Sequence, residues 1–574
     1  MTISQDSPAT APAANGSTAK AKAPEWIPIN EQPLYKPRKL RVVCVGAGYS
    51  GLMLAYKYKY QTPMDNFLDL AIYEKNAEVG GTWYENRYPG VACDVPAHIY
   101  TFSWEPNPEW TSFYAKGGEI FEYIRRTATK YGLDERVQFN SKVVSSIWDE
   151  AAGKWSIKVE QTQADGTTEI IEDAADVLVN GSGILNKWNW PSIPGLHDFK
   201  GTLLHSAKWD TNLDWDGKRV GIIGNGSSAI QILPQMQRTA SRVVNYVRSP
   251  TWVSSPYSAD LTPEGKNFQY TDAQKKELRE NPEAMLALRR TIEDNFNKFF
   301  YSLLNGTPQQ KAITELFQKD MRSRLNNDPV LCEKLIPNWA VGCRRLTPGD
   351  GYLEALQASN TFVEFQPIVR VTPKGIETTD GRVEELDIIV CATGFDVSFA
   401  PHWDVVGRNG VSLAEQWRDD PQAYFGICAT NMPNYFIFNG PNCPVGHGSL
   451  LAVMEWTAEF VLKWCNKIAS EDLRAVTVNA QATAEYNAYT QEFMGRTAWS
   501  SGCQSWYKNN KGADGKVTAM YAGSILHYKE ILASFRTEDF DLEYNCTKNR
   551  FKFMGNGITQ LEEAGGDLSF YVTK

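Results

Sequence analysis

The sequence predicts an α/β fold with two Rossmann-like dinucleotide-binding domains, an inserted helical subdomain and an extended N-terminal arm. Two glycine-rich turns support this prediction: residues 46–51 (GAGYSG) follow the strand-like run 41–45, and residues 224–229 (GNGSSA) follow the run 219–223. A strand, tight turn and helix of this kind presents backbone N–H groups to a pyrophosphate. The third observation is a charged, helix-favouring stretch between about residues 256 and 341.

The first glycine turn contains Gly46, Gly48 and Gly51, and the apolar strand that follows it, residues 69–73, ends at Glu74. A carboxylate at this point can accept hydrogen bonds from the hydroxyls of an adenosine ribose. A single G-x-G-x-x-G pattern also arises by chance in a chain with 43 glycines, and the alternative is a structural βαβ unit without a ligand. The strand and the acid behind the turn favour FAD or NAD.

The second glycine turn has the pattern of a site for a phosphorylated dinucleotide. The strand that follows it, residues 243–247, ends in a basic residue and no acid. A ribose 2′-phosphate would be repelled by a carboxylate and held bidentately by a guanidinium, so the site is predicted to bind NADPH. The residues expected to contact this dinucleotide are Gly224, Gly226, Ser227, Ser228, Ala229, Arg248 and Ser249.

Five residues separate Glu74 from the pair Gly80-Gly81, and the pattern E-x5-G-G is a recurring continuation of FAD-binding Rossmann units. FAD is therefore assigned to the first turn, and NADPH is expected to pass hydride to the flavin. The flavin could then reduce a disulfide, transfer electrons or activate oxygen. The sequence has no C-x-x-C or similar redox cysteine pair, and oxygen is the favoured acceptor.

The domain boundaries are placed where the sequence patterns change. The tail is rich in Ala, Pro, Ser and Lys, and the arm after it carries three prolines. The inserted helices are expected over residues 272–291 and 309–325 and should form a cap over the active site. The expected parts are a mobile tail and extended arm (1–38), the FAD-binding domain (39–188, then 384–574 with the C-terminal region), the NADPH-binding domain (189–255 and 342–383) and the helical insertion (256–341).

Composition restricts the class of protein and its partners. The 574 residues carry a net charge of −9, which disfavours nucleic acid as a partner. Ten scattered cysteines suit reduced thiols in a cytoplasmic protein, and six histidines without H-x-x-x-H spacing suit no metal site. No apolar run approaches the ~20 residues of a membrane span, and no protein partner is implied.

Two longer motifs lie between the two glycine turns. Residues 199–210 (FKGTLLHSAKWD) fit the pattern F-x-G-x-x-x-H-x-x-x-W-[P/D], and residues 80–94 fit [A/G]-G-x-W-x4-[F/Y]-P-[G/M]-x3-D. These two patterns, with the Ala392-Thr393-Gly394-Phe395 stretch, resemble the type I Baeyer–Villiger monooxygenases of the flavin-containing monooxygenase superfamily. The resemblance spans roughly residues 40–540.

The resemblance implies an NADPH-dependent FAD enzyme that converts ketones to esters or lactones. In that family the reduced flavin captures O2 as a C4a-peroxide, and the peroxide anion attacks the ketone carbonyl. A fixed cation beside the flavin would keep the peroxide deprotonated and stabilise the charged adduct. Arg345, in the Arg344-Arg345 pair, matches the family's active-site arginine, and Asp94 matches the carboxylate that orients it.

Other site residues are implied by the same resemblance. Arg344 is expected to help Arg248 and Ser249 hold the NADPH phosphate, although many relatives have Lys at its position. Trp506 resembles the tryptophan of a mobile loop that folds over the nicotinamide ribose. His205 matches a histidine in an interdomain linker and is not expected to act as a base. The residues expected to line the flavin are Thr82, Trp83, Tyr84, Asp94 and Tyr100.

Two alternative functions stay open. A flavin monooxygenase that oxygenates amine nitrogen or sulfur would use the same cofactors, but with a protonated hydroperoxide, and a redox-sensing or binding module would hold nucleotides without turnover. The pocket is expected from the helical insertion, the loop 440–449 and the Trp506 loop, and the uncharged flanks of those loops favour open-chain or medium-ring aliphatic ketones. Regiochemistry and oligomeric state are not predicted.

Overall fold

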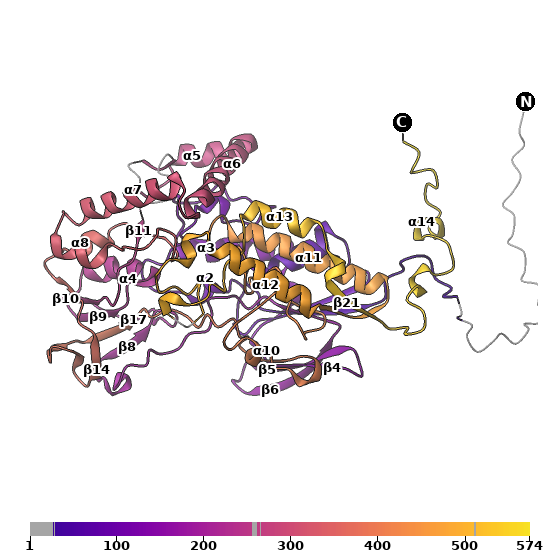
Figure 1. The fold of residues 1–574 in the computed structure, drawn as a ribbon, viewed down its shortest axis with the longest axis horizontal. Coiled ribbons are helices and arrows are strands. Elements are labelled where there is room, and N and C mark those ends of the chain that lie inside the picture. Colours follow the sequence, from indigo (N-terminus) through magenta and orange to yellow (C-terminus); the bar gives the residue numbers. More distant parts are fainter. Residues whose placement is uncertain (1–26, 28, 255–260, 264–265, 510–511, 574) are drawn as a thin grey trace, which may run out of the picture.

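Two sheets, each of five parallel strands, form the framework of the protein (Figure 1). The computed structural model describes residues 27, 29–254, 261–263, 266–509 and 512–573. The first sheet has the strand order β19-β7-β1-β2-β3, and the second has the order β13-β10-β9-β17-β8. All pairings within both sheets are parallel, which confirms the predicted α/β class.

The first sheet is built from apolar runs that are buried on both faces, as expected of parallel strands covered by helices. The glycine turn 46–51 joins β1 to the helix α1, which packs against the long helix α11. The strands are β1 (Leu40–Val45), β2 (Leu68–Tyr73), β3 (Val137–Gln138), β7 (Val177–Asn180) and β19 (Tyr435–Ile437). The helices of this part are α1 (Tyr49–Tyr56), α2 (Thr82–Glu85), α3 (Gly117–Tyr131), α10 (Leu413–Gln416), α11 (Leu450–Ser470), α12 (Ala480–Met494) and α13 (Ile525–Ala533).

The second sheet contains β8 (Thr202–His205), β9 (Arg219–Ile223), β10 (Arg242–Tyr246), β13 (Thr361–Glu364) and β17 (Ile388–Cys391), with α4 (Ser227–Gln237) and α9 (Tyr352–Ala355) beside it. Strand β17 pairs with both β9 and β8, in the interior of this sheet. The boundary expected at residue 384 is therefore too early, because the chain completes the second sheet before it returns to the first.

Smaller sheets surround the two large ones (Figure 1). A four-stranded sheet with the order β18-β4-β5-β6 packs beside the first sheet, and its strands β4, β5 and β6 are antiparallel. The strands are β4 (Ser141–Asp149), β5 (Lys154–Thr162), β6 (Thr168–Ala175), β18 (Asp404–Val406), the antiparallel β14 (Ile368–Thr372), β15 (Gly375–Thr378) and β16 (Val383–Glu385), and the pairs β11 (Val253–Ser254) with β12 (Thr347–Pro348) and β20 (Leu473–Val478) with β21 (Phe540–Tyr544).

The helical insertion consists of α5 (Asp272–Glu280), α6 (Pro282–Lys298), α7 (Pro308–Arg324) and α8 (Pro329–Leu335). The single helix expected over residues 272–291 is divided at Asn281, because the following proline disfavours helical geometry there. The side chain of Asn281 caps α6. Helix α6 buries Ile292 and Phe296 in the core around the first sheet, whereas α7 contributes to the core of the second. The insertion therefore braces both large sheets.

The N-terminal arm lies against the C-terminal segment, away from the main body of the molecule (Figure 1). Residues 1–26, where a mobile tail was expected, are outside the described part of the chain. The backbone N–H of Leu34 donates to the carbonyl of Ile558, and the ring of Tyr35 stacks on Phe553 with centroids 5.2 Å apart. The short helix α14 (Gln560–Glu563) follows this contact.

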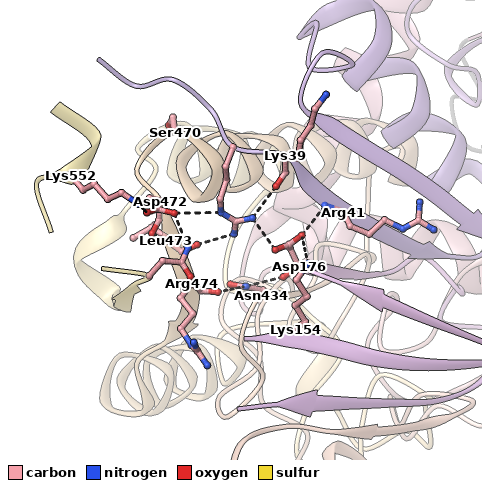
Figure 2. Close-up of polar contacts among 12 residues, drawn as sticks. Lys39, Arg41, Lys154, Asp176, Asn434, Ser470, Asp472, Leu473, Arg474 and Lys552 are labelled. Atoms are coloured by element: carbon pink, nitrogen blue, oxygen red, sulfur yellow. Dashed lines mark hydrogen bonds and ion pairs between the residues drawn. The ribbon is translucent and has the colours of Figure 1, made fainter. Parts of the chain in front are cut away.

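A buried carboxylate joins the arm to the first sheet. Asp176 accepts hydrogen bonds from the guanidinium of Arg38 and from the backbone N–H of Arg41, each at 2.9 Å. The side chain of Asn434 donates to the Asp176 carbonyl at 2.8 Å, and Lys154 lies 3.5 Å from the carboxylate (Figure 2). The contacts of Arg38, Arg41 and Lys154 with the carboxylate compensate the cost of burying its charge. Among the described helices, none has both the length and the apolar character needed to cross a membrane.

Acid should weaken the fold through His98, whose side chain is only 1% exposed and whose two ring nitrogens have no hydrogen-bond partner among the described residues. Burial, aided by the charge of Arg289, lowers its pKa from 6.5 to about 4. The unfolded chain therefore binds this proton first, and stability present above pH 6.5 is lost as the pH falls towards 4. We expect the urea midpoint of His98→Phe to depend less on pH over this range than that of the wild type.

The exposed His197 provides the matched control. A His197→Gln variant should keep the pH dependence of the wild type. Equal slopes for His98→Phe and the wild type would contradict the assignment of this acid sensitivity to His98.

Candidate active site

One cavity of about 620 Å³ runs between the two large sheets. Its walls combine the first glycine turn, the end of β2, the residues after Gly80, the start of α4 and the segment around Arg345. The predicted site residues that line it are Gly46, Gly48, Glu74, Thr82, Trp83, Asp94, Tyr100, Ser227, Ser228, Arg345 and Trp506.

The first glycine turn requires small residues for packing as well as for ligand access. Gly46 has φ +106°, and a Cβ added to it would lie 2.6 Å from the carbonyl oxygen of Gly181. A Cβ on Gly51 would lie 2.2 Å from the carbonyl oxygen of Gly46. Gly48 is the N-cap of α1, so the first N–H groups of this helix open towards the cavity, as a pyrophosphate site requires.

Glu74 holds the turn in shape as well as lining the cavity. Its carboxylate accepts from the backbone N–H of Ala47 at 2.8 Å and from the N–H and side chain of Asn76 at 2.9 and 2.7 Å. The side chain of Glu74 is buried, and this burial raises its pKa against the lowering effect of the hydrogen bonds. The acid expected to bind a ribose thus also fixes the backbone of the glycine turn.

Most of the residues expected to line the flavin share one wall of the cavity. The indole N–H of Trp83 donates to the hydroxyl of Tyr100 at 3.3 Å, and both residues lie beside Thr82 and Asp94 in the lining. Tyr84 has a different environment: its ring packs on Phe121 and under the guanidinium of Arg87. Among the described residues that form the cavity wall, Tyr84 is absent.

The second glycine turn leaves room beside the start of α4. Gly224 has φ +114°, and a Cβ there would lie 2.5 Å from the carbonyl oxygen of Ala392. A Cβ on Gly226, the N-cap of α4, would meet nothing within 4 Å. Ser227 and Ser228 line the cavity, whereas Ala229 is buried in the core of the second sheet. The open space at Gly226 fits the close approach of a phosphate group.

Two arginines come together beyond this turn. Burial lowers the pKa of Arg344, and the positive charge of Arg248 lowers it further. Within the described part of the chain, no carboxylate lies at ion-pair distance from either guanidinium. The side-chain amide of Asn225 donates to the carbonyl of Ser249 at 2.8 Å, which fixes the segment after β10. Two like charges held near each other favour an anion as the ligand.

Arg345 and Asp94 form a bidentate ion pair across the cavity wall. The Nε and Nη2 of Arg345 donate to the two carboxylate oxygens of Asp94 at 2.7 and 2.8 Å, and Nη1 donates to the carbonyl of Val445 at 2.9 Å. The two side chains are 28% and 23% exposed, so solvent screens this pair less than one on the open surface. The geometry fixes a positive charge at the cavity wall.

The residues before Asp94 dock the first domain on helix α4. The hydroxyl of Tyr88 donates to the side chain of Gln231 at 2.8 Å, and the amide of Gln231 donates to the carbonyl of Ala92 at 3.0 Å. Gly90 has φ +83°, and a Cβ there would lie 2.4 Å from the Gln231 carbonyl oxygen. The sequence pattern 80–94 therefore includes a contact between the two domains, which sequence reasoning missed.

The Trp506 segment, residues 498–509, lies close to Arg344 and Arg345. Cys503 forms a disulfide with Cys343, the residue that precedes Arg344. The expectation that all ten cysteines are reduced and unpaired is wrong for these two. Each of the two cysteines stands within three residues of a predicted site residue, which was the available signal. Their spacing alone did not predict that the two segments meet.

His205 and the inserted helices do not contribute to the cavity wall in the described part of the structure. His205 lies at the end of β8, where its ring stacks on Trp188 with centroids 4.4 Å apart, and burial lowers its pKa to about 4. The expectation that the insertion supplies pocket walls is not met, because its helices pack their apolar faces on the two cores instead. The wall includes Val445 from the expected loop 440–449, together with Leu450 and Met454 from the start of α11.

Comparison with known proteins places this chain in a family. The sequence pattern of the flavin-binding monooxygenase-like family matches residues 39–331, and the chain belongs to this family. It is 49% identical to the FAD-binding monooxygenase tazF of Aspergillus terreus over 95% of this chain and 97% of that protein. It is 32% identical to a Baeyer–Villiger monooxygenase of Pseudomonas aeruginosa, over 92% of this chain and 95% of the relative.

A solved structure has the same fold. The crystal structure of cyclohexanone monooxygenase from Rhodococcus sp. Phi1 bound to NADP+ covers 89% of this chain and 100% of its own, with a TM-score of 0.75 and 25% identity. The predicted arrangement of two dinucleotide-binding domains is thereby confirmed, as is the resemblance to Baeyer–Villiger enzymes stated from the two motifs. Membership of the family also confirms the expected flavin cofactor.

The two glycines of the second turn should respond differently to substitution. Gly226→Ala adds a methyl group where no protein atom lies within 4 Å, so the melting temperature should stay unchanged while the Kd for NADPH rises about tenfold or more. Gly224→Ala should instead destabilise the fold, because of its positive φ and the nearby Ala392 carbonyl. Calorimetry and thermal unfolding measure the two effects. Unchanged NADPH affinity in folded Gly226→Ala would contradict the assigned site.

The arginine beyond β10 should select the phosphorylated nucleotide. Arg248→Ala is expected to raise the KM for NADPH by about 10- to 100-fold while leaving the KM for NADH nearly unchanged, because only NADPH carries the 2′-phosphate. Arg238, an exposed arginine just after the other end of α4, provides the matched control. Equal losses with both nucleotides, or an equal effect of Arg238→Ala, would contradict the proposed phosphate site.

Proposed function

We propose that this protein is an NADPH- and O2-dependent flavin monooxygenase that converts ketones to esters or lactones. The observation that carries the proposal is the bidentate contact between Arg345 and Asp94, which fixes a positive charge on the wall of the cavity between the two dinucleotide-binding domains. The overall reaction consumes a ketone, O2, NADPH and a proton, and yields the ester, NADP+ and water.

The two glycine turns and the cavity between them suit the two cofactors, although among the described residues Gly226, Arg248 and Arg344 lie outside the cavity wall. The first glycine turn and the N-terminus of α1 suit the FAD pyrophosphate, and the wall of Thr82, Trp83 and Tyr100 suits the ring system. The open space at Gly226 suits the pyrophosphate of NADPH, and the pair of Arg248 and Arg344 suits its 2′-phosphate. When bound, the flavin supplies the reduction and activation of dioxygen, and NADPH supplies the hydride.

The protein supplies a fixed charge where the reaction develops negative charge. A guanidinium held by a carboxylate and a backbone carbonyl cannot rotate freely, so Arg345 needs little reorganisation to stabilise an oxyanion on the substrate. Asp94 compensates the cost of burying this charge and sets its orientation. A cation at this position favours a deprotonated oxygen nucleophile, and therefore attack on a carbonyl carbon.

The substrate pocket favours an uncharged ketone. Val445, Leu450, Met454 and Trp506 contribute apolar surface to the wall, in addition to the rings that suit the flavin. Open-chain or medium-ring aliphatic ketones fit this lining. The alternative reaction, oxygenation of amine nitrogen or sulfur, requires a protonated oxygen donor, which a fixed guanidinium disfavours.

Removal of the guanidinium should separate the two halves of the reaction. In Arg345→Ala, flavin reduction by NADPH should persist, because the nucleotide sites remain, while the rate of ester formation falls about 10²- to 10³-fold. Stopped-flow absorbance measures flavin reduction, and mass spectrometry of linear, cyclic and aryl ketones measures ester formation.

The matched control is Arg370→Ala, which removes an arginine from an exposed ion pair with Glu377 on the β14–β15 hairpin. This control should keep both half-reactions. Undiminished ester yield in Arg345→Ala would remove Arg345 from the mechanism, and oxidation of sulfides with no ketone product by the wild type would favour the alternative reaction.

A further inference from the structure

We propose that the disulfide between Cys343 and Cys503 is a positioning element of the nicotinamide site, which holds the Trp506 segment against Arg344 and Arg345. This inference rests on the proposed function, because it assumes that a nicotinamide dinucleotide binds beside these residues. The cysteines are separated by 160 residues in sequence, and their Cα atoms are 6.2 Å apart. Their side chains are 0% and 1% exposed, so the bond lies inside the protein.

The disulfide joins two parts of the cavity wall. Cys343 immediately precedes Arg344 and Arg345, and Cys503 stands three residues before Trp506. Both Arg345 and Trp506 line the cavity. A covalent bond between their segments therefore limits how far the tryptophan can move from the fixed guanidinium.

Two hydrogen bonds also hold the Trp506 segment, one from the chain just before Cys343 and one from the chain that follows β10. The backbone N–H of Ala340 donates to the hydroxyl of Ser501 at 3.2 Å, and the guanidinium of Arg248 donates to the side chain of Gln504 at 3.2 Å. Bonds of this kind contribute little net stability, because water competes for the same groups, and Arg248 is exposed. The disulfide is the strongest of these three links.

The constraint at Cys503 is transmitted to Trp506 because the segment is fixed on its other side too. The ammonium of Lys508 is buried and donates to the carbonyl oxygens of Ser501, Cys503 and Ala513 at 2.5, 3.1 and 2.5 Å. This ammonium therefore binds backbone carbonyls that precede Trp506 and one that follows it. Trp506 therefore lies between two anchored points, and release of one of them frees its backbone.

A cross-link of this kind can be closed and opened by thiol chemistry when a reagent reaches the two sulfurs. It forms when the two thiols lose two protons and two electrons to a peroxide, which is reduced to two molecules of water when it is hydrogen peroxide. A trialkyl phosphine reverses the step: the phosphorus is oxidised to a phosphine oxide with an oxygen from water, and each sulfur takes one proton. The redox state of this pair would then set how firmly the dinucleotide is held.

The first measurement establishes the bond. All ten cysteines lie among the described residues, and eight of them are unpaired. Alkylation of the denatured full chain should label eight cysteines before phosphine treatment and ten after it. Labelling of all ten without reduction, in protein exposed to hydrogen peroxide, would overturn the proposal.

The second measurement tests the positioning role with the double variant Cys343→Ala/Cys503→Ala. Its Kd for NADP+, measured by calorimetry on the FAD-loaded protein, should rise about two- to tenfold, because the segment must then be ordered at the expense of binding energy. The matched control Cys332→Ala/Cys428→Ala removes two buried, unpaired thiols and should bind NADP+ as the wild type does. Phosphine-reduced wild type should match the first variant.

A cycle with Trp506→Ala separates positioning from general destabilisation. If the disulfide acts through the tryptophan, removal of the disulfide should change NADP+ affinity little in the Trp506→Ala background. The same loss of affinity with and without the tryptophan, or equal affinity of the disulfide and thiol forms, would overturn the proposal.

The outcome is independent of the ketone reaction. Failure of every ketone as a substrate, with NADP+ affinity still dependent on the disulfide, would reject the proposed reaction and leave this inference standing. Normal ester formation, with an NADP+ affinity that does not depend on the disulfide, would support the proposed reaction and reject this inference. Absence of NADP+ binding by every form would overturn both.

Discussion

The contact between Arg345 and Asp94 is the constraint on which the site depends, because it can form only when the two dinucleotide-binding domains hold one relative position. Asp94 belongs to the chain that follows the first glycine turn, and Arg345 belongs to the chain that follows the insertion. A bidentate arginine–carboxylate contact tolerates little displacement, since both N–H groups must face both oxygens. The cavity shape and the direction of its charge are therefore linked to domain orientation.

Other features support the same orientation by different physics. Gly90 allows backbone to meet helix α4 at a distance that a side chain would prevent, and Tyr88 completes this contact with a hydrogen bond to Gln231. The inserted helices bury apolar side chains in both cores. Directional hydrogen bonds, close backbone contact and apolar burial each penalise a different displacement, so the domains are held by more than one type of interaction.

The sequence predicted those parts of the protein that depend on local pattern. The strands before the glycine turns, the turns themselves and the basic end of β10 were read correctly, because strand periodicity and glycine geometry are written in consecutive residues. The break at Asn281 was missed, although an Asn-Pro pair is a local signal for a helix boundary.

Features that depend on the meeting of distant segments were not predictable from spacing. The Cys343–Cys503 bond and the contact between Tyr88 and Gln231 join residues more than 100 positions apart. The placement of β17 in the second sheet likewise follows from pairing with β8 and β9, not from its own composition. The packing of Tyr84 against Phe121, outside the cavity wall, depends on side-chain direction after the turn. The pairing of Arg345 with Asp94 was expected only from a family resemblance.

The contact between the arm and the C-terminal segment has a practical consequence for handling the chain. Tyr35 covers one face of Phe553, and Leu34 satisfies the carbonyl of Ile558, so each end of the polypeptide shields groups of the other. A shortened variant that lacks one end would leave an aromatic face and a backbone acceptor of the other end open to solvent. Trimming for crystallisation should therefore remove Leu34 and Tyr35 together with the segment from Phe553 to Ile558, or keep both.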